Sequence, residues 1–168
     1  MIGDNTGAVL GLVLEHGIGL GQGPFAVCVT GDRDWQHSNP VHTSVVQEAL
    51  DDVATYVAMP HEVTLIHGAA RGVDSIAAKV AEQLGFRVVP FPAEWDKYGR
   101  AAGPIRNERM VTWPPDLVLA FHDNLAASKG TRDMVQQAIR ARVPVIRVHS
   151  NGRAYIVTDI RRMDVASA

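Results

Sequence analysis

Short apolar runs alternate with amphipathic segments along most of this chain, and this alternation limits its fold more than any other feature. Such runs are typical of strands buried on both faces, and the segments between them carry apolar residues at helical spacing. Strands that alternate with helices form right-handed βαβ crossovers. We therefore predict an α/β fold in which helices cover both faces of a mainly parallel sheet of five or slightly more strands. The predicted strands are 25–30, 63–66, 86–91, 116–122 and 143–148, and the predicted helices are 41–58, 73–84, 104–112 and 131–142.

The helix predicted at 73–84 has the clearest pattern in the chain. Its apolar residues recur on one face, which indicates a stripe that packs against the sheet. The stripe is formed by Val73, Ile76, Val80 and Leu84.

The chain divides into a glycine-rich lead-in at 1–24, a regular domain at 25–149 and a tail at 150–168. Glycines alternate near the end of the lead-in, but a nucleotide-binding glycine loop follows a strand and opens a helix, and this one does neither. We expect a flexible lead-in that contains either an accessory strand or a short helix at Ala8–Leu14. The tail contains a candidate edge strand at Ala154–Thr158.

Composition and charge are those of an ordinary globular protein, with 46% hydrophobic residues, 20% charged residues and a net charge of −2. This charge gives no bulk attraction to nucleic acid or to an anionic membrane. The first residues lack the positive region of a signal peptide, and no apolar run approaches the ~20 residues that span a bilayer. We expect a cytoplasmic protein with no membrane partner.

The seven histidines are dispersed, and neither they nor the single cysteine form a metal-binding or nucleophile pattern. Cys28 lies in an apolar run, which favours a buried thiol in a reducing compartment. His67, at a strand end, is interpreted as a satisfied core histidine, with a ligand contact as the alternative. We predict no metal and no required cofactor.

In parallel sheets, ligands bind outside the carboxyl ends of the strands, near the point where strand order reverses. The loops at that edge are 31–40, 67–73, 92–104 and 122–131. An anionic ligand is predicted because a guanidinium group binds two phosphate oxygens at once, and five arginines lie in or beside these loops: Arg33, Arg71, Arg100, Arg106 and Arg132. The alternative is pairing within the protein, with Asp32, Asp34, Asp74 or Asp96.

Two strand-to-helix turns have the composition of phosphate-binding turns. Residues 67–74 and 128–133 place glycines where backbone N–H groups at a helix start can approach an anion. Neither turn is a Walker A motif, so a triphosphate with magnesium is not indicated. Helix capping by Ser128 or Thr131, and a macrodipole role for Asp74, are the alternatives.

The long segment 92–104 combines aromatic rings with arginines, which suits a base and a phosphate rather than disorder. Trp95, Tyr98 and Arg100 are its candidate ligand contacts. Glu94 and Asp96 are its candidate catalytic carboxylates, and pairing with Lys97 or Arg100 is their alternative role.

Four motifs, at 29–35, 66–74, 91–107 and 129–134, resemble those of the YspA-like (cpYpsA-related) branch of the SLOG superfamily. That superfamily includes DNA-processing protein A, the LOG phosphoribohydrolases and nucleotide-sensing domains. The resemblance implies a Rossmann-like three-layer sandwich that binds a nucleotide or nucleotide derivative. The residues at matching motif positions are Gly31, Gly68, Gly72, Asp74, Arg106, Asn107, Gly130 and Thr131.

The LOG motif Pro-Gly-Gly-x-Gly-Thr-x-x-Glu ends in a catalytic glutamate, and Met134 stands at that position here. Ser128 and Lys129 replace the leading glycines. Asp133 is one residue early and is expected to point roughly 100° away on a helix. The resemblance therefore implies binding without LOG-type hydrolysis.

Our leading hypothesis is a bacterial or phage sensor or sequestering module that binds an ADP-ribose-like molecule or a nucleoside phosphate. The alternatives are a nucleotide N-glycosidic or phosphoester hydrolase, and a single-stranded DNA binder, which the acidic balance disfavours. A homodimer is a candidate assembly. The predicted ligand set is Gly31, Asp32, Arg33, Trp35, Gly68, Ala69, Arg71, Gly72, Asp74, Trp95, Tyr98, Arg100, Arg106, Asn107, Lys129, Gly130 and Thr131.

Overall fold

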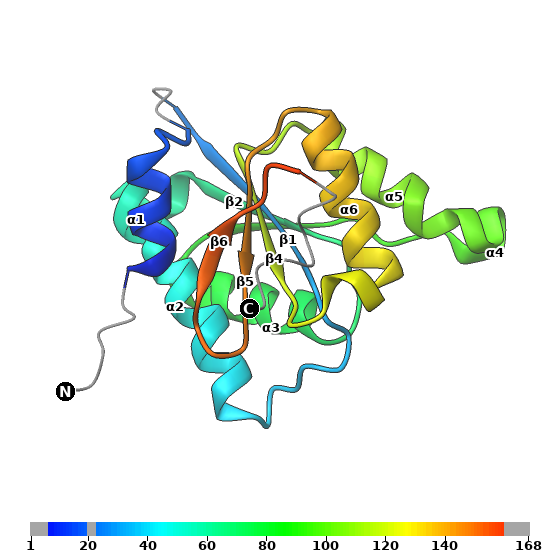
Figure 1. Ribbon diagram of the computed structural model, residues 1–168, viewed down its shortest axis with the longest axis horizontal. Coiled ribbons are helices and arrows are strands. Elements are labelled where there is room, and N and C mark those ends of the chain that lie inside the picture. Colours follow the sequence, from blue (N-terminus) through cyan, green and yellow to red (C-terminus); the bar gives the residue numbers. More distant parts are fainter. Residues whose placement is uncertain (1–6, 20–22, 160–168) are drawn as a thin grey trace.

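A single sheet in the order β3-β2-β1-β4-β5-β6 lies at the centre of the computed structural model, which describes residues 7–19 and 23–159 (Figure 1). Five strands are parallel, and β6 pairs antiparallel with β5 at the edge. The predicted α/β fold is confirmed. The strands are β1 (Phe25–Gly31), β2 (Val63–His67), β3 (Arg87–Pro90), β4 (Leu117–Phe121), β5 (Val145–Val148) and β6 (Ala154–Ile156).

The strand order reverses between β1 and β4. From β1 the chain winds outward through β2 to β3, then crosses back to place β4 on the other side of β1. The loops after β1 and β4 therefore diverge from a common point and leave a crevice at the carboxyl edge. This topology places the candidate site.

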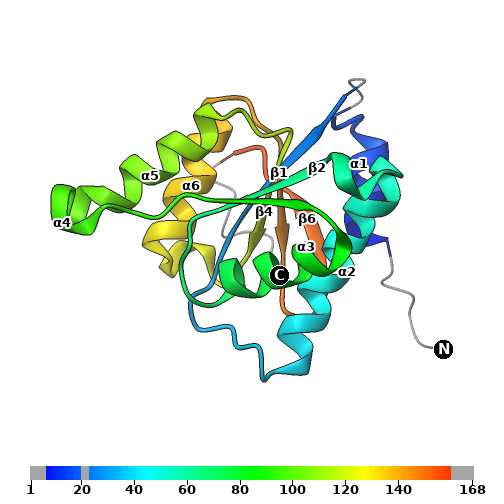
Figure 2. The ribbon, with the colours of Figure 1, turned by 180° about the vertical axis from the view of Figure 1, so that it is seen from behind.

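Helices cover both faces of the sheet, which makes three layers (Figures 1 and 2). One face carries α1, α2 and α3, and the other carries α5 and α6. Within the described residues, no helix is both long and apolar enough to cross a membrane. The helices are α1 (Ala8–Glu15), α2 (Pro40–Val57), α3 (Val73–Leu84), α4 (Trp95–Tyr98), α5 (Ala102–Thr112) and α6 (Lys129–Arg140), with short 3-10 turns at Pro60–Glu62, Gly99–Ala101 and Leu125–Ala127.

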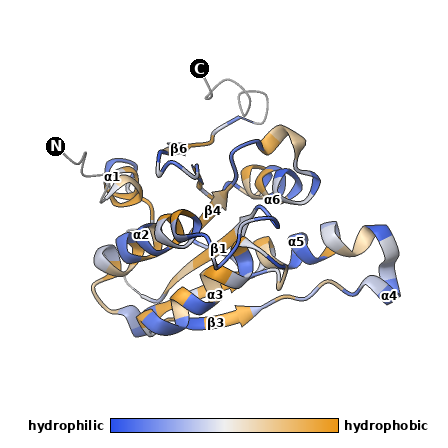
Figure 3. Ribbon diagram, turned by 90° about the horizontal axis from the view of Figure 1, so that it is seen from below, coloured by the Kyte–Doolittle hydropathy of each residue, from blue (hydrophilic) through white to orange (hydrophobic). Residues whose placement is uncertain are grey.

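Alternate residues of each central strand supply two apolar cores, because successive side chains of a strand point to opposite faces. Val27 and Val29 pack beneath α2 and α3, while Cys28 packs beneath α5 and α6. Figure 3 shows these hydrophobic strands between helices whose outer faces are polar. Burial raises the pKa of the Cys28 thiol, which is a structural residue as predicted.

Part of the lead-in forms the helix α1. Of the two alternatives for Ala8–Leu14, the structure has the helix, and Val9 and Val13 are buried in the core with α2. Asp52 of α2 accepts hydrogen bonds from the Val9 and Leu10 N–H groups, both at 3.1 Å. These contacts fasten the first turn of α1. Residues 1–6 and 20–22 of the lead-in, and 160–168 of the tail, lie outside the described residues.

Several element boundaries differ from the predicted ones by a few residues. Helix α6 begins at Lys129 rather than Thr131 because the Ser128 hydroxyl accepts the Thr131 N–H at 3.2 Å and caps the helix. The segment 92–104, predicted as a loop, contains α4 and a 3-10 turn. The candidate edge strand is confirmed as β6, at Ala154–Ile156.

The apolar stripe of α3 provides a stability test. Ile76 is fully buried, but Leu84 is only half-buried, which corrects the predicted stripe at its last position. We expect Ile76→Ala to lower the free energy of unfolding by roughly 2–5 kcal/mol. Leu84→Ala should lower it by roughly 1–2 kcal/mol, because less of its surface leaves water on folding. Urea unfolding of both variants measures this, and equal losses would contradict the assigned helix facing.

Candidate ligand site at the strand-order reversal

A pocket of about 520 Å³ opens at the carboxyl ends of β1 and β4, and its volume lies in the range of small-molecule sites. Its walls come from the loops after β1, β2 and β4, from α4 and α5, and from the start of α6. The lining residues are Thr30, Gly31, Asp32, Arg33, Ala70, Asp74, Trp95, Arg100, Gly103, Pro104, Arg106, Asn107, Met110, His122, Ser128, Lys129, Gly130, Thr131 and Asp133.

The turn after β2 packs directly on the loop after β1. The Val73 N–H donates to the Asp32 carbonyl at 3.0 Å. Gly72 has φ +81°, and a Cβ at this position would collide with the Asp32 carbonyl oxygen. Gly72 is therefore required for the close approach of the two loops, and it does not line the pocket itself.

Asp74 holds the turn after β2 from within. Its Oδ2 accepts the Gly68 N–H at 3.0 Å and the Ala70 N–H at 3.2 Å. Burial raises the pKa of this carboxyl to about 6, although both hydrogen bonds and the Arg106 charge oppose the rise. Asp74 therefore organises the turn, a role that differs both from complementing the helix macrodipole and from contacting a ligand.

A buried hydrogen-bond chain joins three walls of the pocket. The Arg106 guanidinium donates to the Gly68 carbonyl through Nη1 and to Asn107 Oδ1 through Nε, the latter at 2.9 Å. Asn107 Nδ2 donates to Asp133 Oδ2 at 2.8 Å and to the Gly130 carbonyl at 3.3 Å. These groups hold α5 against the turn after β2 and against α6. Their predicted contact with a ligand stays a prediction.

The start of α6 faces the pocket with a helix N-terminus. Ser128, Lys129, Gly130 and Thr131 all line the cavity. Asp133 also lines it, which corrects the expectation that this carboxylate points away. The reason is the neighbouring Met134, which is fully buried in the core beneath α6 and so turns position 133 toward the cavity.

Six predicted ligand residues lie outside the lining, namely Trp35, Gly68, Ala69, Arg71, Gly72 and Tyr98. Trp35 is 5% exposed and belongs to the core, where it stacks on His42 at 4.7 Å between ring centroids. Arg71 is exposed and pairs with Asp34 at 3.2 Å, outside the pocket lining. The sequence placed Trp35 in the correct loop, but an indole so close to the sheet is buried by the helix that follows.

The candidate carboxylates of the long segment also lie away from the cavity. Glu94 pairs with Arg109 at 2.9 Å, rather than with Lys97 or Arg100 as expected. Asp96 is exposed on α4. Neither side chain lines the pocket, and the same holds for Gly68, Ala69, Tyr98 and Arg132. His67 is buried and accepts the Ala69 N–H at 3.0 Å, which confirms a satisfied core histidine.

Sequence reasoning missed part of the lining. His122 had a usable signal, because it follows directly after the predicted fourth strand, at the same sheet edge as Asp32. The others depend on packing that no local pattern reveals. The missed residues are Thr30, Ala70, Gly103, Pro104, Met110, His122, Ser128 and Asp133.

Two comparisons of sequence identify the family. The Gene 61 protein of Mycobacterium phage D29 is 36% identical over 125 residues, which are 71% of this chain and 93% of the phage protein. The model of the YspA, cpYpsA-related SLOG family matches residues 25–98. The chain belongs to this family. The predicted resemblance is confirmed, and the matched residues include the loops after β1 and β2.

A solved structure shares the fold. The X-ray structure of DNA processing protein A (DprA) from Streptococcus pneumoniae superposes with a TM-score of 0.53 at 16% identity. The alignment covers 74% of this chain and 50% of that chain, so this chain spans about half the length of the DprA chain. This likeness confirms the Rossmann-like fold. Among the described residues, no group of three His, Cys, Asp or Glu side chains is arranged to hold a metal ion.

The raised pKa of Asp74 makes stability depend on pH. The folded state binds the Asp74 proton more tightly than the unfolded state, so stability from this group is present near pH 4 and is lost as pH rises through about 6. We expect wild type to lose on the order of 2–3 kcal/mol relative to Asp74→Asn between pH 4 and pH 7. Asn keeps an acceptor for the two N–H groups without titrating. Urea unfolding at both pH values measures the difference, and parallel profiles would contradict it.

Proposed function

We propose that the pocket binds a nucleotide or nucleotide derivative, as a sensor or sequestering module. The observation that carries this proposal is a helix N-terminus that opens on the pocket beside cations that form no ion pair with the described residues. Within the part of the chain that the structure describes, Arg33, Arg100 and Lys129 form no ion pair, although other surface arginines do. Backbone N–H groups and free cations together suit a phosphate.

An aromatic ring at the same pocket suits a base. Trp95 lines the cavity and is 51% exposed, and its ring edge lies near Gly103 at the start of α5. An exposed indole at the rim of a pocket can stack on a base, and such stacking typically contributes roughly 1–3 kcal/mol. Trp95 and the start of α6 come from different walls, which allows base and phosphate to be held at once.

Binding without cleavage is the favoured form of this function. Met134 stands at the position of the LOG glutamate, and its side chain is sealed in the core. The pocket carboxylates Asp74 and Asp133 are already occupied by hydrogen bonds from the protein. Hydrolysis remains the alternative, and Asp133 together with His122 would be its candidate acid–base groups because both line the cavity.

Single-stranded DNA binding is a third candidate, and the DprA likeness is what recommends it. A strand-binding groove usually carries a series of aromatic rings along a basic track. Here one exposed ring borders a pocket that contains three aspartates, which favours a small ligand.

The cation contribution can be tested with a control arginine that lies outside the pocket. We expect the double variant Arg33→Ala, Arg100→Ala to lose about tenfold or more in affinity for ADP-ribose or a nucleoside monophosphate, because each removes a charge-assisted contact to phosphate. Arg71→Ala, outside the pocket, should bind as wild type does. Titration calorimetry measures both, and equal losses in the two proteins would remove the pocket from the phosphate site.

Turnover is the second test. We expect no base release when the protein is incubated with nucleoside monophosphates, NAD or ADP-ribose, because a missing general acid typically costs 10²–10⁴-fold in rate. Chromatography of the products measures this. Base release that scales with protein and disappears in Asp133→Asn would establish the hydrolase instead. Preferential binding of an oligodeoxynucleotide would establish the DNA binder.

A further inference from the structure

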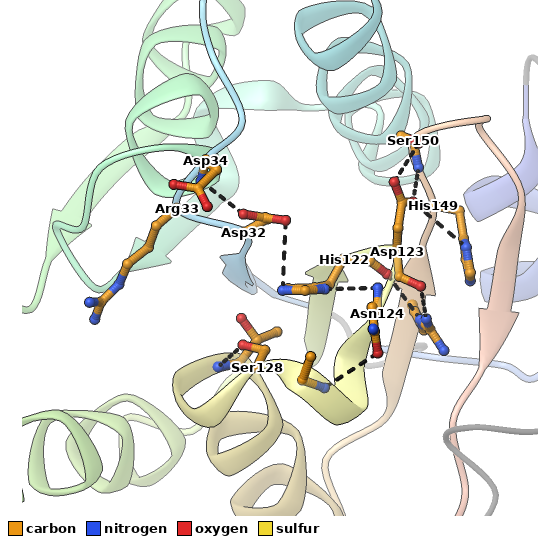
Figure 4. Close-up of polar contacts among 12 residues, drawn as sticks. Asp32, Arg33, Asp34, His122, Asp123, Asn124, Ser128, His149 and Ser150 are labelled. Carbon is orange, nitrogen blue, oxygen red and sulfur yellow. Dashed lines mark hydrogen bonds and ion pairs between the residues drawn. The ribbon is translucent and has the colours of Figure 1, made fainter.

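Asp32 and His122 face each other in the pocket from the ends of β1 and β4, the two strands that flank the reversal (Figure 4). His122 Nε2 lies 3.7 Å from Asp32 Oδ2. This separation exceeds a hydrogen bond, so both atoms can take another partner. Neither atom has a hydrogen-bond partner among the residues that the structure describes.

The second polar atom of each side chain is already engaged. Asp32 Oδ1 accepts the Asp34 N–H at 2.8 Å, and His122 Nδ1 accepts the Asn124 N–H at 3.0 Å. The neutral imidazole therefore carries its proton on Nε2. Burial lowers the pKa of His122, against the opposing effect of Asp32, which keeps the ring neutral at pH 7. The pair presents one acceptor and one donor side by side.

The backbone behind His122 is held in place by a buried arginine. Arg147 donates to the His122 carbonyl at 3.0 Å and to the Asp123 carbonyl at 2.6 Å. The Asp123 carboxylate in turn accepts the N–H and hydroxyl of Ser150, at 2.7 and 2.6 Å. These contacts reduce the freedom that His122 loses when a ligand binds, which favours affinity.

An adjacent acceptor and donor fit two adjacent hydroxyl groups, since one hydroxyl donates to the carboxylate and its neighbour accepts from the imidazole. A phosphate does not fit here, because Asp32 repels it, and an apolar group would leave both atoms unpaired. Ser128, at the start of α6, lines the same pocket as His122, so one ligand can reach both this position and the proposed phosphate position.

We propose that Asp32 and His122 bind the 2′,3′-diol of a ribonucleotide and make the pocket selective for ribose over 2′-deoxyribose. This inference rests on the proposed function and specifies the sugar of its ligand. With this selectivity the pocket would bind free ribonucleotides in preference to DNA, whose sugars lack the 2′-hydroxyl.

The test is titration calorimetry at pH 7 with four matched pairs, AMP and dAMP, GMP and dGMP, CMP and dCMP, and UMP and dUMP. We expect the ribonucleotide of the best-binding pair to bind about tenfold or more tightly than its 2′-deoxy counterpart. Equal binding within that pair would overturn this inference and leave the proposed function standing. Binding of no nucleotide, ADP-ribose included, would overturn both.

Variants assign the selectivity to the pair. In the double variant Asp32→Asn, His122→Leu, the ratio of the two affinities should fall toward one, and affinity for the 2′-deoxynucleotide should also fall, because its 3′-hydroxyl loses its partner. His122→Gln should retain part of the ratio, because its amide can donate near the Nε2 position. Asp34→Asn is the matched control and should keep the wild-type ratio. Thermal melts verify folding, and an unchanged ratio in the folded double variant would overturn the assignment.

Discussion

The buried guanidinium of Arg106 is the interaction on which the pocket depends most. It lies between the turn after β2 and α5, and through Asn107 it reaches α6, so three walls share one network. A buried charge needs compensation, and here carbonyl and amide oxygens and the nearby Asp74 supply it. The same charge partly offsets the burial of Asp74, which shapes the turn. The same buried charge therefore sets both the shape of the pocket and the electrostatic balance beneath it.

Most of the fold could be predicted from the sequence because the central strands are buried on both faces. Runs such as 25–30 and 116–122 read as strands from composition alone, and the alternation with helices determined the parallel sheet. For α1 the sequence left a helix and a strand as alternatives, because the residue that anchors it, Asp52, is more than forty residues away. Interactions of that range leave no local pattern.

The site was predicted at the level of loops and less well at the level of side chains. Topology alone determines which loops meet at the reversal, so Asp32, Arg100 and Gly130 were placed correctly in the lining. The rotation of α6 about its axis determines whether Asp133 or Met134 faces the pocket, and only packing in the core sets that rotation. The prediction that Trp35 contacts the ligand was wrong for the same reason, because burial rather than residue type decides whether a ring can contact a ligand.

The packing of α1 limits where a shorter fragment of this fold can begin. Val9, Val13 and Ile18 lie in one apolar cluster with α2 and the sheet, although the family match begins only at residue 25. A fragment started at that point would expose apolar side chains of α2, including Val45 and Ala49, and would leave Asp52 without the two amides that it now binds. Such a surface is an aggregation hazard. The folding unit is thus larger than the region by which the family is recognised.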